Sequence, residues 1–503
     1  PSGPIISAFE GTAGGFSVSL VDAEGNGLEV DSVKAKFDGA DIVVTKSKSD
    51  GETTISYSTD SSLPSASEHT IELTYSDEKG SVHVKTLSFS VPKYIILNAD
   101  SIVSDSIKGE SGFIANITQI SIEQTGKASL HNPMMDHEGR VWMTHTIRAP
   151  QTPAFCREGS SHPSAQLFPV ESSQRHLSVF DPTTGEFTLI DTCFGTHHLQ
   201  IAEDTDNTVW ASNPGSPVVG WLNMRRFDET GDEQRSQGWC PYILDANGNG
   251  RQDEYVEPDQ PIDPTRDKRI AGGSYGIVPN PVDGSIWVAQ GYNVPGAIIR
   301  LSPGTNPPMT CLAEVYEPPF NNPASPTSGF TPRGIDVDRD GVIWTALAGS
   351  GHLASFDRRK CETLNGPTAT GQHCPEGWTL YETPGPHFKG VTYSGSADML
   401  YYNWVDQFDT FGLGTNVPIA TGTGSDSLLA LPPGGEFVVL RVPYPMGFST
   451  RGVDGRIDDP EAGWKGRGLW ANYAIHAPWH TEGGKGATSK AVKFQLRPDP
   501  LAR

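Results

Sequence analysis

Apolar and polar residues alternate along most of this chain, in short runs that Gly, Asp, Asn and Pro interrupt. In "TPRGIDVDRDGVIWTAL" (331–347), two such runs flank a turn, and the second run contains a tryptophan. This pattern predicts two antiparallel strands joined by a tight turn. Related stretches, "HNPMMDHEGRVWMTH", "HLQIAEDTDNTVWASN" and "YGIVPNPVDGSIWVAQ", begin at His131, His198 and Tyr275. The chain therefore contains an internal repeat.

The spacing within this repeat is regular. Eleven or twelve residues separate the residue that opens a unit from the aromatic residue that ends its second strand. Two more strands follow each pair, and four strands per repeat are typical of a propeller blade. A sixth unit opens at Arg451 and reaches Trp470 after an insertion in its turn. The other five pairs are His131 and Trp142, His198 and Trp210, Tyr275 and Trp287, Arg333 and Trp344, and Lys389 and Tyr401.

The repeat predicts an all-β fold in which the blades form a β-propeller. One blade cannot bury both of its faces alone, so the blades must stack around an axis and the ring must close. We expect "TQISIEQTG" (118–126) to close the ring by pairing with the last strand, in "AVKFQLRP". Six blades are favoured, with seven as the alternative because residues 95–117 could contain another strand.

The first ninety or so residues have a different pattern. Stretches such as "HTIELTYSDEKGSVHVKTLSFSV" alternate apolar and polar residues between turns, and this part of the chain has no Trp or Cys. Short alternating strands with turns at roughly ten-residue spacing predict an antiparallel β-sandwich. The expected organisation is a sandwich over 1–94, a linker over 95–117 and the propeller over 118–503.

Composition and charge exclude several classes of partner. The 503 residues include 55 Gly and 40 Pro but only 19% charged residues, which favours many short strands over helices. A formal net charge of −23 argues against nucleic acid as a partner. No apolar run of about 18 residues occurs, so we expect no membrane insertion. The chain begins at Pro1, which fits a mature exported chain as well as a trimmed one.

Six cysteines without metal-binding spacing predict disulfides and an extracytoplasmic location, periplasmic or secreted. Six buried free thiols are the alternative. Cys361 and Cys374 flank a loop that contains Gly and Pro, and they are the predicted local bridge. The spacing does not pair the other four, Cys156, Cys193, Cys240 and Cys311.

The residues that open the units carry candidate binding chemistry. The innermost strand of a blade lines the channel of a propeller, so these residues are expected to converge. Arg and Lys at this position predict a site for a small anionic ligand, such as a carboxylate, sulfate, phosphate or enolate. The alternative is that acidic residues of neighbouring blades neutralise them. The expected ring is His131, His198, Tyr275, Arg333, Lys389 and Arg451.

Histidines are concentrated in the first two units, at His131, His145, His197 and His198. Neutral imidazoles near one axis can act as a general base or can bind a metal such as Zn, Cu or Fe. We therefore interpret His131, His198 and His145 as catalytic candidates. A catalytic divalent metal is an alternative, although no local spacing such as HExxH supports it.

A separate motif, "DANGNGRQDEYVE", begins at residue 245 and follows the D-x-N-x-N-G-x-x-D pattern of a calcium loop. Val256 stands where such loops usually have a bidentate glutamate, and Glu257 follows it. The motif predicts a structural Ca²⁺ that orders the insertion 245–270, with a solvated turn as the alternative. "DVDRDG" (336–341) is instead interpreted as the hairpin turn of its blade. The expected calcium ligands are Asp245, Asn247, Asn249, Asp253 and Glu257.

Two phrases carry a family resemblance: "GIDVDRDGVIW" (334–344) and "FDPTTGEF" (180–187). Over roughly residues 118–500 the chain resembles the streptogramin (virginiamycin B) lyase group and related NHL-type propellers. The resemblance implies the chemistry of that group, in which His and Glu near the channel act with magnesium on a lactone ester. This chain has His145, Asn213 and Gln290 where the lyase repeats often have that Glu. The first part resembles immunoglobulin-like modules of exported bacterial proteins.

These observations together predict an exported β-propeller that acts as a lyase or lactone/ester hydrolase on an anionic small molecule at the central channel. A non-catalytic scaffold that binds a ligand or a protein is the alternative. A metal-dependent oxidoreductase with histidine ligands is the second alternative. The sandwich is expected to offer a surface for a protein partner.

Overall fold

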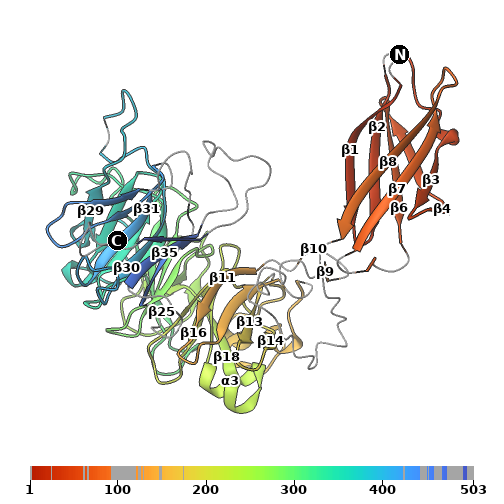
Figure 1. The fold of residues 1–503 in the computed structure, drawn as a ribbon. Coiled ribbons are helices and arrows are strands. Elements are labelled where there is room, and N and C mark those ends of the chain that lie inside the picture. Colours follow the sequence, from red (N-terminus) through yellow and green to blue (C-terminus); the bar gives the residue numbers. More distant parts are fainter. Residues whose placement is uncertain are drawn as a thin grey trace. The chain divides into compact units, whose positions relative to one another are not determined.

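The chain divides into two compact units, Pro1–Ala128 and Ser129–Arg503 (Figure 1). The predicted linker boundaries fall near residues that the structure does not describe, so they stay predictions. In the part that is described, no helix has the length and apolar character needed to span a membrane. The computed structural model describes residues 3–23, 25–59, 63–64, 67–91, 121–122, 126–127, 130–146, 150–173, 175–392, 394–422, 425–441, 450, 453–457, 467–472 and 491–494.

The first unit is a β-sandwich of two four-stranded antiparallel sheets. Its strands are β1 (Ile5–Thr12), β2 (Gly15–Val21), β3 (Lys34–Phe37), β4 (Ala40–Ile42), β5 (Thr45–Ser49), β6 (Glu52–Ser58), β7 (Ser67–Ser76) and β8 (Val82–Val91), with a 3₁₀ turn η1 (Val30–Ser32). Along β7, His69, Ile71, Leu73 and Tyr75 are buried while the residues between them are not. This is the alternation from which the sandwich was predicted.

The strand orders of the two sheets are β1-β2-β6-β5 and β4-β3-β7-β8. In chain order these correspond to A-B-E-D and C′-C-F-G, the arrangement of an immunoglobulin-type sandwich with one added strand. Both sheets contribute to one core, which includes Val18 and Ile55 from the first and Ile71 and Leu73 from the second. That this module belongs to the immunoglobulin-like family stays a prediction.

The second unit is a β-propeller built from consecutive antiparallel sheets. Each of the first five contains a four-stranded meander, and the sixth has three strands among the described residues. The meanders are β11 (Leu130–Met135), β12 (Val141–His145), β13 (His176–Asp181) and β14 (Glu186–Ile190); β15 (His198–Ile201), β16 (Val209–Ser212), β17 (Val218–Leu222) and β18 (Gln237–Pro241); β22 (Ile277–Pro279), β23 (Ile286–Gln290), β24 (Ala297–Ser302) and β25 (Leu312–Tyr316); β26 (Pro332–Val337), β27 (Ile343–Leu347), β28 (His352–Phe356) and β29 (Trp378–Glu382); β30 (Leu400–Asp406), β31 (Val417–Gly422), β32 (Ser427–Ala430) and β33 (Val438–Arg441); and β34 (Val453–Ile457), β35 (Arg467–Asn472) and β36 (Ala491–Phe494).

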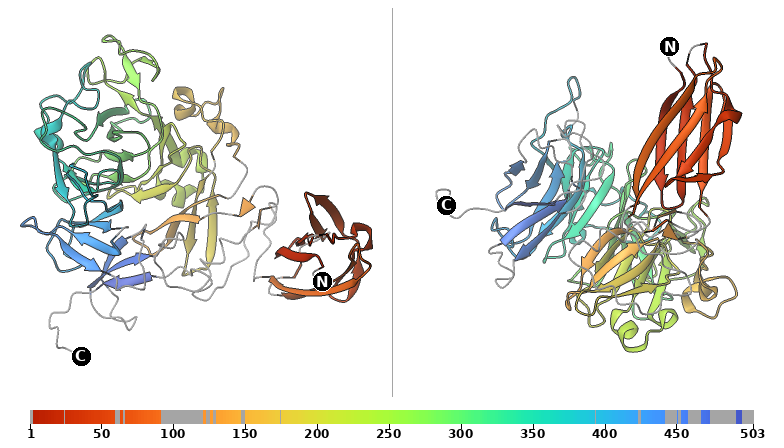
Figure 2. Two further views of the ribbon diagram at one scale, coloured as in Figure 1. Left: turned by 90° about the horizontal axis from the view of Figure 1, so that it is seen from above. Right: turned by 45° about the vertical axis from the view of Figure 1, so that its right-hand side comes forward.

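The first strand of each sheet contacts the first strand of the next sheet, from β11 through β15, β22, β26 and β30 to β34. The sheets therefore surround a common centre, as the left view of Figure 2 shows. Large side chains fill the space between neighbouring sheets. Trp287 of the third sheet, for example, shares a core with Phe356 and Trp378 of the fourth.

Insertions lengthen several connections between the strands of the propeller. After β18, three short strands extend the third sheet beyond β25: β19 (Ile243–Leu244), β20 (Tyr255–Val256) and β21 (Asp267–Arg269). The helical elements of this unit are also short and lie in connections: η2 (Ala154–Cys156), α2 (Pro163–Leu167), α3 (Met224–Thr230), α4 (Glu233–Ser236), η3 (Arg358–Lys360) and η4 (Pro375–Gly377).

The predicted closing strand pairs differently from our expectation. β9 (Ser121–Ile122) pairs with β10 (Gly126–Lys127), and the described part of β36 pairs with β35 alone. Closure of the ring and a blade number of six stay predictions, because residues 92–120 lie outside the described part.

The predicted register of the fifth unit is wrong. Its innermost strand is β30 and its second strand is β31, whereas the sequence analysis placed Lys389 at the opening and Tyr401 at the end of the second strand. The connection between β30 and β31 spans ten residues (407–416), whereas the connection between the first two strands of each of the first four sheets spans five to seven. The fixed aromatic spacing therefore selected the wrong pair of segments.

A buried carboxylate holds the innermost hairpins of the first and fourth sheets. Asp338 Oδ1 accepts the N–H groups of Asp340 and Val342 at 3.0 and 2.9 Å, and its Oδ2 accepts Trp344 Nε1–H at 3.1 Å. Asp136 accepts the corresponding groups, including Trp142 Nε1–H at 2.9 Å. These bonds explain the Asp-to-Trp spacing of the repeat and confirm that "DVDRDG" is a hairpin turn.

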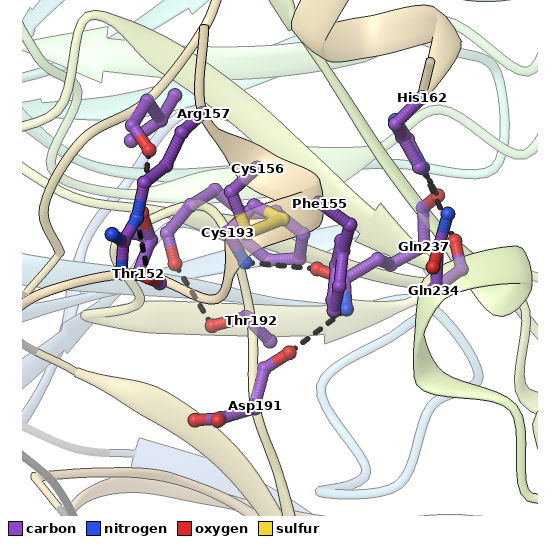
Figure 3. The surroundings of a disulfide bond; sticks show 12 residues. Thr152, Phe155, Cys156, Arg157, His162, Asp191, Thr192, Cys193, Gln234 and Gln237 are labelled. Carbon is purple, nitrogen blue, oxygen red and sulfur yellow. Dashed lines mark hydrogen bonds between the residues drawn. A yellow bond between two sulfur atoms is a disulfide. The ribbon is translucent and has the colours of Figure 1, made fainter. Parts of the chain in front are cut away.

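Three disulfides join the six cysteines: Cys156–Cys193, Cys240–Cys311 and Cys361–Cys374. The predicted local bridge is confirmed. Around Cys156–Cys193, shown in Figure 3, the Cys193 N–H donates to Gln237 Oε1 at 2.9 Å, and Gln237 Nε2 donates to the Asp191 carbonyl at 2.8 Å. The bridge and these bonds tie the segment 150–173 to the first two sheets.

We expect Asp338→Ala to lower the free energy of unfolding by about 1 to 3 kcal/mol, because it leaves the Trp344 indole N–H without an acceptor. Urea unfolding monitored by tryptophan fluorescence measures this loss. Asp340→Ala is the matched control, since Asp340 is exposed in the same turn. Equal effects of the two substitutions would show that the hairpin does not depend on Asp338.

Candidate functional site

Side chains from five sheets meet at the innermost strands. The Tyr402 hydroxyl on β30 lies 3.0 Å from Nδ1 of His198 on β15 and within hydrogen-bonding distance of its Nε2. The His198 ring also packs at 5.1 Å from His131 and 4.8 Å from Tyr275, measured between ring centroids. The guanidinium carbon of Arg333 on β26 lies 4.5 Å from the Tyr275 ring. We define the central cluster as His131, His197, His198, Tyr275, Arg333, Tyr401 and Tyr402.

The histidine side of this cluster comes from two neighbouring sheets. His131 and His197 have ring centroids 4.1 Å apart, and those of His197 and His198 lie 4.4 Å apart. One ring nitrogen from each of the three histidines lies within 4.8 Å of the other two. His198 is buried, whereas His131 and His197 are half-buried, so solvent reaches the cluster.

Backbone contacts fix the two strands that carry these histidines. Thr144 Oγ1 is within hydrogen-bonding distance of the carbonyl oxygens of His131 and His197, at 2.5 and 3.0 Å. The Leu199 N–H donates to Asn132 Oδ1 at 2.7 Å. Asn132 has a positive φ of 44° and lies at an irregularity in the β11–β12 pairing, which turns its amide toward β15. The close approach of the imidazoles thus follows from how the first two sheets join.

The other side of the cluster is an arginine surrounded by phenols. Arg333 Nη2 donates to the Tyr401 hydroxyl at 2.7 Å, and its guanidinium carbon lies 4.1 Å from the Tyr401 ring centroid. The hydroxyls of Tyr401 and Tyr275 lie 2.8 Å apart. Arg333 Nε is buried without a hydrogen-bond partner, and no carboxylate in the described part of the chain forms an ion pair with this guanidinium.

Burial and positive charge set the protonation states at this site. Burial, together with the cationic forms of His197 and His131 and the charge of Arg333, holds the pKa of His198 well below its usual value. Burial also raises the pKa of Tyr275 to about 12, and that of Tyr402 well above its usual value. Near neutral pH the His198 imidazole is therefore neutral and the phenols keep their protons.

Of the six predicted ring positions, the structure brings together His131, His198, Tyr275 and Arg333. Lys389 lies in the exposed loop that precedes β30, and no contact joins it to the central cluster within the described residues. It is displaced because the strand β30 begins at Leu400, eleven residues later. Arg451 lies outside the described residues.

The structure places His145 inside the first sheet rather than in the central cluster. Its Nδ1 lies 3.0 Å from Ser178 Oγ, and its ring packs 5.6 Å from that of Phe187. Side chains alternate along a strand, so His145 faces away from the side on which Thr144 contacts His131. Burial lowers the pKa of His145 to about 4, with a smaller contribution from the positive charge of Arg175.

The sequence did not identify three members of the cluster, Tyr401, Tyr402 and His197, or the nearby Arg175. Tyr401 and Tyr402 fill the position assigned to Lys389, and the alternating stretch "LYYNWVD" was the signal that an innermost strand begins there. His197 was noted only as a neighbour of His198. Arg175, which precedes β13, was not considered, yet its charge contributes to lowering the pKa of both His145 and His198.

The predicted calcium motif forms a compact loop. Asp245 is buried, and its carboxylate accepts the N–H groups of Gly248, Asn249 and Gly250 at 2.8 to 3.1 Å. The side chains of Asn247 and Asn249 both reach Asp253 Oδ2. Four of the five predicted oxygen-bearing residues are therefore close together, and Ca²⁺ binding stays a prediction.

Glu257, the fifth predicted calcium ligand, instead forms an ion pair with Arg269. The pairing of β20 with β21 accounts for this, because it brings Glu257 toward Arg269 and away from the loop. Asp267, on β21, is the carboxylate that sequence reasoning missed. It is fully buried, its Oδ2 accepts the Asp253 N–H at 2.7 Å, and its Oδ1 has no hydrogen-bond partner. Burial and the nearby carboxylates raise its pKa to about 6.

The fold and the central cluster define a β-propeller in which side chains from successive sheets form a site at the centre. No family model and no curated protein matches the chain. Among solved structures it is similar to virginiamycin B lyase from Staphylococcus aureus, with 12% identity and a TM-score of 0.38, over 74% of this chain and 85% of that one. It is also similar to a streptogramin B lyase, with 14% identity and a TM-score of 0.39, over 76% and 87%.

A third similar structure is an auxiliary nutrient binding protein from Bacteroides thetaiotaomicron, with 8% identity and a TM-score of 0.36, over 93% of this chain and 95% of that one. Similarity to the lyase structures agrees with the predicted resemblance. The β-propeller assignment itself rests on the sheets described above, and at these identities no activity transfers to this chain.

We expect chelation of calcium to lower the melting temperature and to increase protease cleavage within 245–270, because the loop carboxylates would then repel one another. Asp245→Ala and Asp267→Asn should each reproduce the loss without chelator. Asp259→Asn is the control, because Asp259 is exposed in the same insertion. A melting temperature that is the same in excess Ca²⁺ and in chelator would show that the loop is only a turn.

Lowering the pH tests whether His145 is buried as a neutral imidazole. Its pKa is about 4 in the folded chain and about 6.5 in the unfolded chain, so protons bind the unfolded chain first as the pH falls below 7. The neutral imidazole therefore contributes stability above pH 6.5 that is lost progressively toward pH 4.

Between pH 7 and pH 5 the wild type should lose about 1 to 2 kcal/mol more unfolding free energy than His145→Gln. Denaturant titrations of both proteins at several pH values measure this difference. The other buried histidines are the same in both proteins, so their effects cancel. His137→Gln, a change at an exposed histidine, should follow the wild type. Parallel pH profiles for wild type and His145→Gln would contradict the assignment.

Proposed function

We propose that this protein binds a small anionic molecule at the central cluster and acts on it as a lyase or as a lactone/ester hydrolase. The observation that carries the proposal is the state of Arg333. Its guanidinium is half-buried among aromatic rings, its Nε has no hydrogen-bond partner, and no described carboxylate pairs with it. A partly desolvated charge of this kind is stabilised by a counter-ion, and an anionic ligand supplies one.

The surroundings of Arg333 favour a planar, forked anion such as a carboxylate. A guanidinium offers parallel N–H donors that match two oxygens of one carboxylate. Tyr275 and Tyr401 add hydroxyl groups beside it. The protein as a whole carries a net charge of −23, so the positive charge at this position is a local feature of the site and not an average property of the chain.

The imidazoles beside Arg333 supply the proton acceptor that either reaction needs. In an elimination, an imidazole nitrogen takes the proton from the carbon next to the carbonyl group. The electrons of that C–H bond form a C=C bond, and the adjacent C–O bond breaks to release the leaving group with its electron pair. In a hydrolysis, the imidazole takes a proton from water while the water oxygen bonds to the carbonyl carbon. The ester C–O bond then breaks, and the released oxygen takes the proton back from the imidazolium. His198, held by Tyr402, and His131 are the proposed acceptors.

We also propose that the protein acts outside the cytoplasm. Its six cysteines all form disulfides, and such bonds persist in oxidising compartments.

We expect Arg333→Ala to weaken the binding of the anionic ligand roughly tenfold or more, since a lost charge-assisted bond costs about 1.5 to 3 kcal/mol. A panel of small carboxylates, sulfates and phosphate esters, screened by thermal shift and followed by calorimetry, identifies the ligand to use. His198→Ala should reduce turnover more than affinity.

Arg339→Ala is the matched control for Arg333→Ala. It removes an exposed arginine of the same sheet that pairs with Glu203. Affinity that is unchanged in Arg333→Ala would rule out the proposed anion site. Binding that depends on Arg333 without conversion of any bound compound would favour the non-catalytic alternative.

A further inference from the structure

We infer that His131, His197 and His198 together form a binding site for one divalent transition-metal ion of the zinc class. The carrying observation is that one ring nitrogen from each histidine lies within 4.8 Å of the other two. This site follows from the geometry of the cluster and does not depend on the proposed reaction.

The ligand set selects the class of ion. Three imidazoles, with no carboxylate joining them among the described residues, suit Zn, Cu, Ni or Co, whereas Ca²⁺ and Mg²⁺ require oxygen ligands. In a tetrahedral site with Zn–N bonds of about 2.0 to 2.1 Å, ligand nitrogens stand roughly 3.3 Å apart. The separations within 4.8 Å in this structure would need to shorten by up to about 1.5 Å, which rotation of the rings about their side-chain torsions could supply.

The orientation of the rings favours ligation over apolar stacking. Their planes are inclined by 38° for His131 and His197, 68° for His131 and His198, and 74° for His197 and His198. The three rings are therefore not stacked in parallel, and one nitrogen of each lies near the nitrogens of the other two.

Neighbouring residues hold the three histidines in position, as the residues behind the ligands of a metal site do. Tyr402 contacts the ring of His198, and Thr144 bridges the backbone carbonyls of His131 and His197. Such contacts orient metal ligands before the ion binds. Three protein ligands leave a fourth position open, as in catalytic zinc sites.

The open position gives the metal a role beside Arg333. The Tyr275 ring packs 5.1 Å from His197 and 4.8 Å from His198, and the guanidinium carbon of Arg333 lies on that tyrosine. An anion that binds Arg333 is thus close to the ion as well. With an ion bound, the imidazoles would be its ligands and could not accept the proton. The ion would lower the pKa of a bound water molecule, and the hydroxide formed when that water loses a proton would be the base or nucleophile instead.

The test uses the full chain, treated with chelator and then titrated with Co²⁺ alone in excess Ca²⁺, which saturates any site in the loop at 245–253. We expect one equivalent of Co²⁺ to bind with the visible absorption of tetrahedral cobalt, and Zn²⁺ to displace it. His197→Ala should weaken Co²⁺ binding roughly 100-fold or more, because loss of a ligand exceeds the 10- to 100-fold effect of losing an outer contact.

His197→Asn provides a second variant if His197→Ala is poorly folded, as judged by circular dichroism and melting temperature. His137→Ala, a change at an exposed histidine of the β11–β12 hairpin, should bind Co²⁺ as the wild type does. No saturable Co²⁺ binding by the wild type, or equal binding by the wild type and both His197 variants, would overturn the inference.

Arg333→Ala separates this inference from the proposed function. It should keep the Co²⁺ spectrum while losing affinity for the anion. If Arg333→Ala loses anion binding while neither the wild type nor any variant binds Co²⁺, the anion site is supported and the metal site is ruled out. If Co²⁺ binds and Arg333→Ala keeps its affinity for the anion, only the anion site is ruled out.

Discussion

The packing of each innermost strand against the innermost strand of the next sheet is the contact on which the rest of the structure depends. Each sheet buries its two faces against the neighbouring sheets of a ring, so the first strand of every sheet faces the centre of that ring. Side chains at the start of those strands then meet although the sequence separates them by as many as 204 residues, as His198 and Tyr402 show. The central cluster is a consequence of this packing rather than of any local motif.

The same constraint explains where the chain tolerates change. Asp136 and Asp338 fix their hairpins from within, so other connections are free to lengthen. The segment 150–173 lies between β12 and β13, and the insertion 245–270 lies between β18 and β22. Cys156–Cys193 cross-links the first segment and Cys240–Cys311 encloses the second, so both disulfides restrict the unfolded chain. Rigid inner hairpins and cross-linked outer loops together hold the cluster in one geometry.

Features that obey a fixed period could be predicted from the sequence, and features that depend on long-range pairing could not. Alternation identified the sandwich, and the repeat identified four of the residues near the centre, His131, His198, Tyr275 and Arg333. Lys389 was misplaced because a longer connection between β30 and β31 broke the spacing on which the alignment relied. Asp267 was missed because strand pairing, not sequence proximity, brings it beside Asp253.

Charge at the centre links the two proposals. Arg333 and Arg175 lie near three histidines in a protein whose net charge is −23, and their positive charge helps to keep the His198 imidazole neutral. A neutral imidazole is the form that accepts a proton or binds a metal ion, and the same arginine charge attracts an anion to its side. A carboxylate in the place of Arg333 would favour imidazolium and repel the proposed ligand. Among the described residues no carboxylate pairs with Arg333, so its positive charge supports both the proposed anion site and the proposed metal site.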